Sequence, residues 1–115
     1  MALQIFGTHK CPDTRKAERF FKERDIPYHF VDLADKGISP GELAVLRKAI
    51  GAENLMDSSS KRYKDRGLAY MDFDAEEEIL ADPLLLRTPV VRVGSRAVAG
   101  HDPAGWSSLA KEGRS

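Results

Sequence analysis

The chain has 115 residues, with 18 Lys+Arg against 18 Asp+Glu, 42% hydrophobic residues and a single cysteine. This length allows one domain, over residues 1–115, with a core that needs no disulfide or metal. A net charge of zero excludes the broad basic surface of a nucleic-acid-binding protein, and no apolar run approaches the ~20 residues that cross a membrane. One cysteine forms no internal disulfide, so we expect a cytoplasmic protein.

The first third of the chain predicts a strand–helix–strand unit. Residues 2–6 form a short apolar run that stops at Gly7, and residues 7–11 form a loop. Pro12 suits the first position of a helix, which we expect to reach about residue 24. Residues 28–33 predict a second strand. This compact unit favours parallel pairing of its two strands.

The middle of the chain is helical. Ser39 and Glu42 form a capping box around Pro40, and Gly51 marks the end of this helix. Two shorter helical stretches follow, around residues 63–69 and 75–80.

The last third returns to strands. Residues 90–93 and 96–99 flank Gly94-Ser95, which predicts a hairpin with a two-residue turn of the primed type. A final helix starts at Asp102-Pro103. The element order predicts an α/β protein with one mixed sheet and helices on its faces.

Cys11 carries the strongest chemical signal. It lies between the first strand and the N-terminus of the first helix, where unpaired backbone N–H groups and the helix dipole favour a thiolate. Lys10 and Arg15 add positive charge, and Asp13 opposes them. The alternative is a small buried hydrophobic cysteine. In this position we favour the reactive thiol.

Two further positions bear on the thiol. Thr14 stands three residues after Cys11, where a dithiol protein has its second cysteine. Its hydroxyl can donate to a thiolate but cannot resolve a mixed disulfide, so a redox cycle needs a thiol from another molecule. Thr88-Pro89 is a candidate cis peptide bond at the entry of an edge strand.

The histidines do not predict a metal site. His9, His29 and His101 are scattered, and a single cysteine offers no zinc-binding spacing. We therefore expect no metal and no tightly bound cofactor. His9 is either a proton partner of Cys11 or a solvated loop residue.

A family resemblance follows from these residues. The segment GTHKCPDTRKA (7–17) after the first strand, a helical middle segment, and LRTPVV (86–91) before a hairpin resemble the arsenate reductase–Spx family. The resemblance implies a thioredoxin-like, glutaredoxin-related fold: a mixed four-stranded sheet flanked by helices, with a helical insertion over about 37–83. It also implies that Cys11 is the nucleophile, that Arg15 is the arginine one turn later, and that Pro89 is a cis-proline facing the cysteine.

The sequence departs from the arsenate reductase pattern at its arginines. Thr88 stands where those enzymes have an arginine before the cis-proline, with Arg87 one position earlier. A second arginine is replaced within residues 57–60, and a third falls near residues 100–101. Loss of these guanidinium groups should weaken bidentate binding of an oxyanion. Thr88-Pro89 and residues 99–102 instead resemble the glutaredoxin elements that hold glutathione.

We therefore expect a monomeric, monothiol thiol–disulfide oxidoreductase of the arsenate reductase-like group, with glutathione or glutaredoxin as the second thiol. Lys10, Thr14 and Arg15 would assist Cys11. The expected substrate-binding residues are Arg87, Thr88, Pro89, His101 and Asp102. The physiological substrate stays open.

The alternative is a non-enzymatic, Spx-like regulator that docks on a protein such as RNA polymerase. Its docking surfaces would be the basic residues 61–66 and the acidic residues 72–78 of the insertion. Spx-type proteins usually carry Cys-x-x-Cys, and Thr14 removes that dithiol here.

Overall fold

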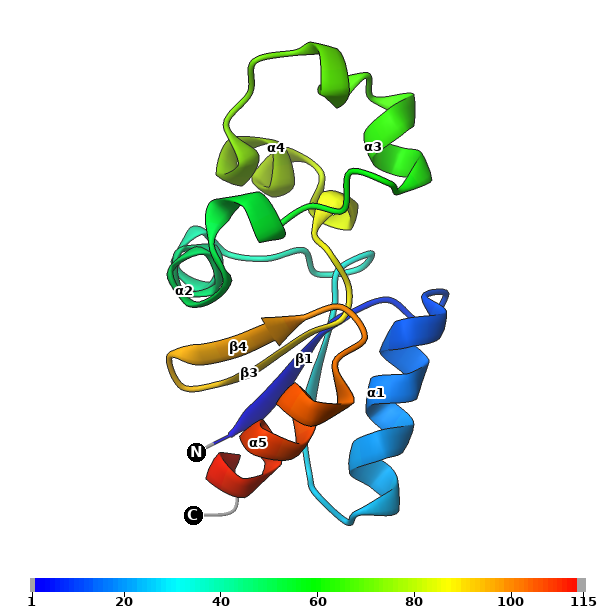
Figure 1. Ribbon diagram of the computed structural model, residues 1–115, viewed down its shortest axis with the longest axis vertical. Coiled ribbons are helices and arrows are strands. Elements are labelled where there is room, and N and C mark those ends of the chain that lie inside the picture. The colour runs from blue at the N-terminus through cyan, green and yellow to red at the C-terminus, as the bar shows by residue number, and fades with distance from the viewer. Residues whose placement is uncertain (1, 114–115) are drawn as a thin grey trace.

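The centre of the molecule is a four-stranded mixed sheet, seen in the computed structural model, which describes residues 2–113 (Figure 1). The strand order is β2-β1-β3-β4. As predicted, β2 is parallel to β1, whereas β3 is antiparallel to both β1 and β4. The strands are β1 (Leu3–Gly7), β2 (His29–Asp32), β3 (Val90–Val93) and β4 (Arg96–Ala99).

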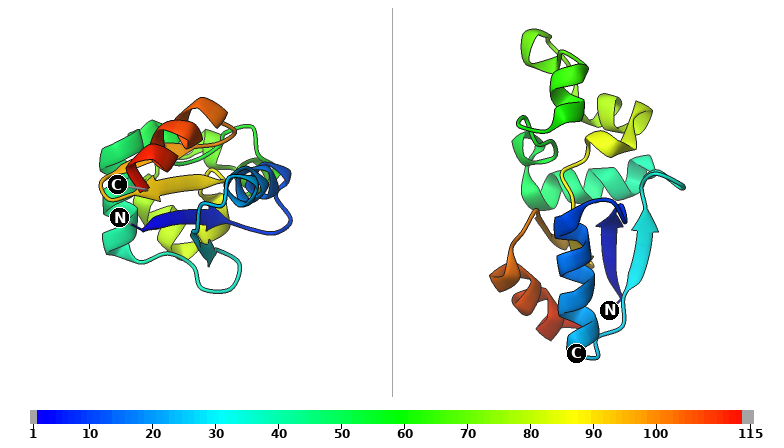
Figure 2. Two further views of the ribbon diagram at one scale, coloured as in Figure 1. Left: turned by 90° about the horizontal axis from the view of Figure 1, so that it is seen from below. Right: turned by 90° about the vertical axis from the view of Figure 1, so that its right-hand side faces the viewer.

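Helices cover both faces of the sheet. Helices α1 (Pro12–Glu23) and α5 (Pro103–Gly113) lie on one face, and α2 (Pro40–Ile50) lies on the other (Figures 1 and 2). Side chains alternate along each strand, so each face has its own core. In β1, Ile5 packs with Phe21 and Trp106 on the α1–α5 side, whereas Phe6 packs with the leucines of α2 on the opposite side.

The segment between α2 and β3 extends the molecule beyond the sheet to overall dimensions of 43 × 25 × 25 Å (Figure 1). It contains α3 (Lys61–Asp65), α4 (Ala75–Ala81) and three short 3₁₀ turns. Its buried side chains continue the core on the α2 side of the sheet; they include Leu55, Leu68, Ile79 and Leu85. The expected helical insertion therefore shares a core with the sheet that it follows.

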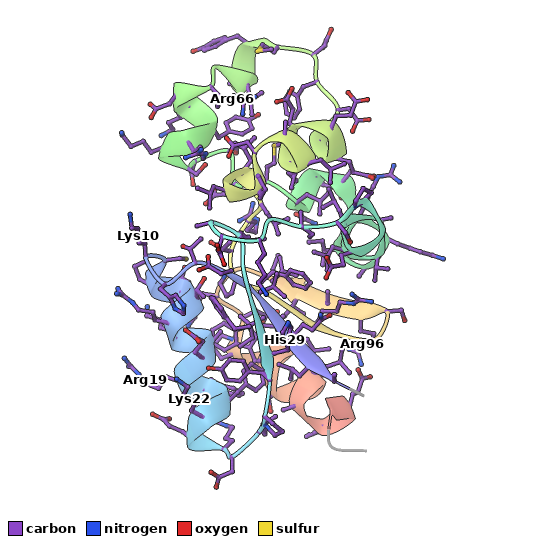
Figure 3. The ribbon with its side chains drawn as sticks, turned by 180° about the vertical axis from the view of Figure 1, so that it is seen from behind. Lys10, Arg19, Lys22, His29, Arg66 and Arg96 are labelled. Carbon is purple, nitrogen blue, oxygen red and sulfur yellow. The ribbon has the colours of Figure 1, made fainter. Side chains whose placement is uncertain are left out.

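Ion pairs hold the outer part of the insertion together. The Arg62 guanidinium lies 2.7 Å from the Asp82 carboxylate, and Arg66, labelled in Figure 3, contacts both Glu78 at 2.5 Å and Asp82 at 3.0 Å. Burial raises the pKa of Asp82, but the two arginines lower it by more, so the pKa of this carboxyl is below its usual range. The two arginines of the basic stretch 61–66 are thus paired with acidic residues of the same insertion.

The local sequence signals are largely confirmed. The Ser39–Glu42 capping box forms with two hydrogen bonds of 3.1 Å. In the hairpin turn Gly94 has a φ of +59°, whereas Ser95 does not enter the positive region, which is typical of a type II′ turn. The expected helix over 63–69 is wrong in extent: α3 ends at Asp65, because Gly67 turns left-handed with a φ of +65° and a separate 3₁₀ turn follows.

Gly7, at the end of β1, generates a stability prediction. A Cβ atom at this position would lie 2.5 Å from Thr14 Oγ1 and 2.6 Å from Thr14 Cγ2. Thr14 is fully buried and cannot move aside. We expect Gly7→Ala to lower the free energy of unfolding by about 1–3 kcal/mol, measured by urea denaturation. Gly41→Ala is the control, because a Cβ there meets nothing within 4 Å; equal stabilities of the two variants would contradict the prediction.

Candidate functional site

Cys11 lies at the point where the loop after β1 enters α1. It is the N-cap residue of this helix, with extended backbone angles of φ −79° and ψ 118°, and Pro12 takes the first helical position. The backbone around it is fixed by hydrogen bonds of 3.2 Å from Cys11 N to Thr8 O and from Arg15 N to Cys11 O. The side chain is half-buried, so its sulfur is accessible but partly shielded.

The Thr88–Pro89 peptide bond is cis, as predicted, and Thr88 faces the thiol. Thr88 Oγ1 donates a hydrogen bond to Cys11 Sγ at 3.2 Å, and Sγ lies 3.9 Å from the Thr88 carbonyl oxygen. The pairing of Phe6 with Val90 explains this proximity, because it aligns the end of β1 with the start of β3. Residues 77 positions apart in the chain thereby form one site.

The expectation that Pro89 enters an edge strand is wrong. Strand β3 lies between β1 and β4, inside the sheet. Proline is tolerated there because the pairing of β3 with its neighbours begins only at Val90. The Pro89 carbonyl accepts a hydrogen bond from Gly100 N at 2.8 Å, which ties the cis-proline to the loop before α5.

The Cys11 thiol has a lowered pKa. Burial raises the pKa, but the side chains of Thr14 and Thr88 and the backbone N–H groups of Thr14 and Asp13 lower it by more through hydrogen bonds to the sulfur. The helix N-terminus therefore acts on the thiol as the sequence suggested.

The two cations expected to assist Cys11 do not lower its pKa. Lys10 and Arg15 are exposed, and within residues 2–113 neither side chain forms a hydrogen bond or an ion pair. Neither contributes to the lowered pKa of Cys11, which comes from hydrogen bonds. Figure 3 shows Lys10 extending outward from the loop before α1. Water screens a charge held in that way.

Thr14 is placed to serve the thiolate form. Its side chain is fully buried, and its Oγ1 has no hydrogen-bond partner of normal geometry among the described residues. The hydroxyl nevertheless lowers the pKa of Cys11, because it lies near enough to turn its proton towards a negatively charged sulfur. An unpaired buried hydroxyl is costly, and ionisation of Cys11 relieves that cost.

Arg87 has a role that the sequence did not predict. Three successive carbonyl groups of the insertion accept hydrogen bonds from it: Asn54 O from Nε at 3.2 Å, Leu55 O from the backbone N at 2.7 Å, and Met56 O from Nη2 at 3.1 Å. The guanidinium thus fastens the residue before Thr88 to the insertion. No local signal reveals this, because all three acceptors are backbone atoms more than 30 positions away.

The remaining candidates lie around the site without touching the sulfur. The Asp102 carboxylate accepts a hydrogen bond from Gly105 N at 3.0 Å and so caps the start of α5. His101 is exposed and packs edge-on against Trp106, with ring centroids 5.4 Å apart. His9 stacks on Phe30 at 4.5 Å and has Nδ1 3.8 Å from a Glu18 carboxylate oxygen.

The described residues form a cleft away from the thiol. In residues 2–113 no group of His, Cys, Asp and Glu side chains is arranged to hold a metal ion. A cleft of about 480 Å³ lies in the insertion; its walls include Arg47, Met56, Tyr63, Phe73 and Arg87, but not Cys11.

None of the described helices is both long and apolar enough to cross a membrane.

The contact between Thr88 and Cys11 generates a pKa prediction. Thr88→Val keeps the shape of the side chain and removes the donor, so the pKa of Cys11 should rise. The thiolate absorbance near 240 nm, followed against pH, measures this change. In the wild type a lowered pKa stabilises the fold above the ordinary thiol pKa, and this gain disappears as the pH falls through the folded-state pKa. The advantage of wild type over Thr88→Val should therefore grow with pH; an unchanged titration would contradict this.

Comparison of the sequence and the fold with known proteins indicates the family of this chain. A model of the ArsC family matches residues 6–109. Global transcriptional regulator Spx 2 of Oceanobacillus iheyensis is 27% identical over 106 residues, which cover 88% of this chain and 78% of that protein. The YffB (PA3664) protein superposes with a TM-score of 0.84 at 22% identity, covering 93% of this chain and 97% of its own. Arsenate reductase from Vibrio cholerae gives a TM-score of 0.80 at 21% identity, covering 95% and 98%. The chain therefore belongs to the ArsC family, which is thioredoxin-like in fold and thiol oxidoreductase-like in character.

Proposed function

We propose that this protein is a monothiol thiol–disulfide oxidoreductase with Cys11 as its nucleophile. The observation that carries the proposal is the environment of the Cys11 thiol. The side chain is half-buried, the pKa of the thiol is lowered, and the sulfur lies 3.2 Å from the Thr88 hydroxyl beside the cis-proline. A thiolate is the reactive form of cysteine, and the site stabilises that form. Membership of the ArsC family supports the same chemistry.

The proposed reaction has two exchange steps. The Cys11 thiolate attacks the glutathione sulfur of a mixed disulfide; the S–S bond breaks, and the other sulfur leaves as a thiolate that takes a proton from water. Cys11 is then joined to glutathione. A second glutathione thiolate attacks this new disulfide, forms oxidised glutathione and releases the Cys11 thiolate. One disulfide is reduced, and two glutathione moieties are joined.

The second thiol must come from outside the chain, because Cys11 is its only cysteine. We infer that glutathione, or the cysteine of a glutaredoxin, supplies it. The main chain of Thr88 lies beside the sulfur and can pair with the backbone of an extended thiol peptide. In the proposed complex, this pairing holds the peptide next to the thiol with which it reacts.

Arsenate is a less suitable substrate for this site. Thr88 offers one hydroxyl where a guanidinium would bind an oxyanion in two places. The neighbouring Arg87 cannot replace it without breaking its hydrogen bonds to Asn54 and Met56. The side chains near Cys11 therefore favour the uncharged S–S group of a disulfide over a multiply charged oxyanion.

The central test is Cys11→Ser. We expect this variant to reduce a glutathione mixed disulfide with glutathione at a rate more than about 100-fold lower than that of the wild type. The serine hydroxyl does not ionise at the pH at which the Cys11 thiol forms its nucleophilic thiolate. A coupled assay with glutathione reductase follows the oxidised glutathione. Circular dichroism confirms that the variant is folded. A Cys11→Ser variant with wild-type turnover would refute the proposed function.

A second candidate function is docking on RNA polymerase, as in Spx-type regulators. It is favoured by the 27% identity to Spx 2 and by the outer end of the insertion, where Tyr70 is 93% exposed and Met71 is 53% exposed. The charged stretches first considered for docking are partly paired with each other, as the Arg66–Glu78 contact shows. Exposed aromatic and methionine side chains are enriched at interfaces between proteins.

Docking predicts a different set of effects. Tyr70→Ser combined with Met71→Ser should abolish co-purification with purified RNA polymerase, whereas Cys11→Ser should leave it unchanged, because the sulfur lies outside the insertion. Leu80→Ser, at a hydrophobic side chain that is only 38% exposed, serves as the control. No binding by the wild-type protein, or equal binding by the double variant, would exclude this function.

A further inference from the structure

A groove separates α1 from the start of α5, on the side of the sheet opposite the insertion. Its volume is about 280 Å³. Six side chains give it its chemistry: Lys16, Arg19, Phe20, Arg24, His101 and Trp106. Glu23 and Pro103 complete the lining. The proposed reaction assigns no role to the cations of this groove.

The groove is positively charged. Three cations, Lys16, Arg19 and Arg24, line it against one carboxylate, that of Glu23. The Arg19 guanidinium forms no hydrogen bond or ion pair within residues 2–113, and Figure 3 shows Arg19 extending from α1 on the outer side of the helix. Lys16 has only a surface contact of 3.7 Å with Asp13, so its charge is largely available to a ligand.

The base of the groove is aromatic. Phe20 packs edge-to-face against Trp106, with ring centroids 5.6 Å apart. Arg24 lies over the Phe20 ring at 3.6 Å and donates a hydrogen bond to the Phe20 carbonyl at 3.0 Å. These contacts hold one of the three cations in place. The groove therefore combines an apolar base with an ordered positive charge.

The distribution of charge along the chain also favours an anion as the ligand of this groove. Residues 37–83 contain ten acidic and six basic residues, whereas the remainder contains eight acidic and twelve basic residues. The zero net charge of the protein thus hides a negative insertion and a positive sheet domain. Such a field attracts an anion to the side of the molecule that carries the groove.

Both walls of the groove begin beside the thiol site. On one wall, Lys16 is two residues after Thr14 in α1. On the other, His101 follows Gly100, whose N–H donates to the Pro89 carbonyl. The groove therefore lies along the helix that has Cys11 at its N-terminus, on the side of the sheet away from the insertion.

We propose that this groove binds a carboxylate of the second thiol, so that the protein selects small, carboxylate-bearing thiols and their mixed disulfides over neutral ones. The inference rests on the proposed function, and it names Lys16 and Arg19 as the residues that determine this preference. Ammonium and guanidinium groups bind carboxylates through charge-assisted hydrogen bonds. The thiol reacts at Cys11 while its anionic end occupies the groove.

The kinetic test compares glutathione with glutathione diethyl ester, whose carboxylates are blocked. The combined Lys16→Gln and Arg19→Gln variant should raise the KM for glutathione about three- to tenfold and leave the KM for the ester within about twofold. The control variant, Lys22→Gln with Lys111→Gln, loses the same charge at exposed positions outside the groove and should change neither value. Equal KM values for glutathione in the groove variant and the wild type would overturn the inference, even if turnover remained normal.

A binding test is independent of the chemistry. Trp106 is the only tryptophan, and it lines the groove, so its fluorescence reports on this site. S-methylglutathione, which cannot react, should produce a saturable change in the wild type and the control variant but not in the groove variant. A response that is the same in all three proteins, or absent from all, would overturn the inference. Absence of turnover with either thiol would defeat the proposed function itself, and with it the assignment of the groove to a second thiol.

Discussion

The candidate site depends on one contact at the end of the sheet, between the Thr88 hydroxyl and the Cys11 sulfur. The two residues approach because β1 and β3 are neighbours and Phe6 is paired with Val90. A shift of this pairing by one residue would turn every side chain of β3 to the opposite face and move Thr88 away from the thiol. The two hydrophobic cores, one on each face, oppose such a shift and thereby maintain the hydrogen bond from Thr88 to the sulfur.

Hydrogen bonds of Arg87 join the insertion to the segment that carries Thr88. These three hydrogen bonds to successive carbonyls fasten the chain just before Thr88, while the Pro89 carbonyl is held from the other side by Gly100. Thr88 therefore sits between two anchored segments. Hydrogen bonds that hold the backbone on both sides of a residue limit its local motion. Arg87 thus has a structural role at the site, and the substrate-binding role that its position in the sequence predicts stays a prediction.

The residue before the cis-proline determines which hydrogen-bond donor faces the thiol. A threonine supplies a single neutral donor, which suits a thiolate and a disulfide, whereas an arginine supplies a charged fork, which suits an oxyanion. Three cations of this protein instead line the groove beside α1. In the proposed complex, charge there binds the carboxylate of a ligand, while the thiolate displacement takes place at the sulfur.

The sequence alone determined the element order, the parallel and antiparallel strands, the capping box and the position of Cys11, because these depend on local periodicity, prolines and turn residues. The cis bond between Thr88 and Pro89 was predicted from the family resemblance rather than from these two residues alone. Only the tertiary structure decided that Thr88 reaches the sulfur, that hydrogen bonds rather than Lys10 and Arg15 lower its pKa, and that Arg87 binds the insertion. These features arise from contacts between residues far apart in the chain, whose partners are often backbone atoms, and no local pattern encodes such contacts.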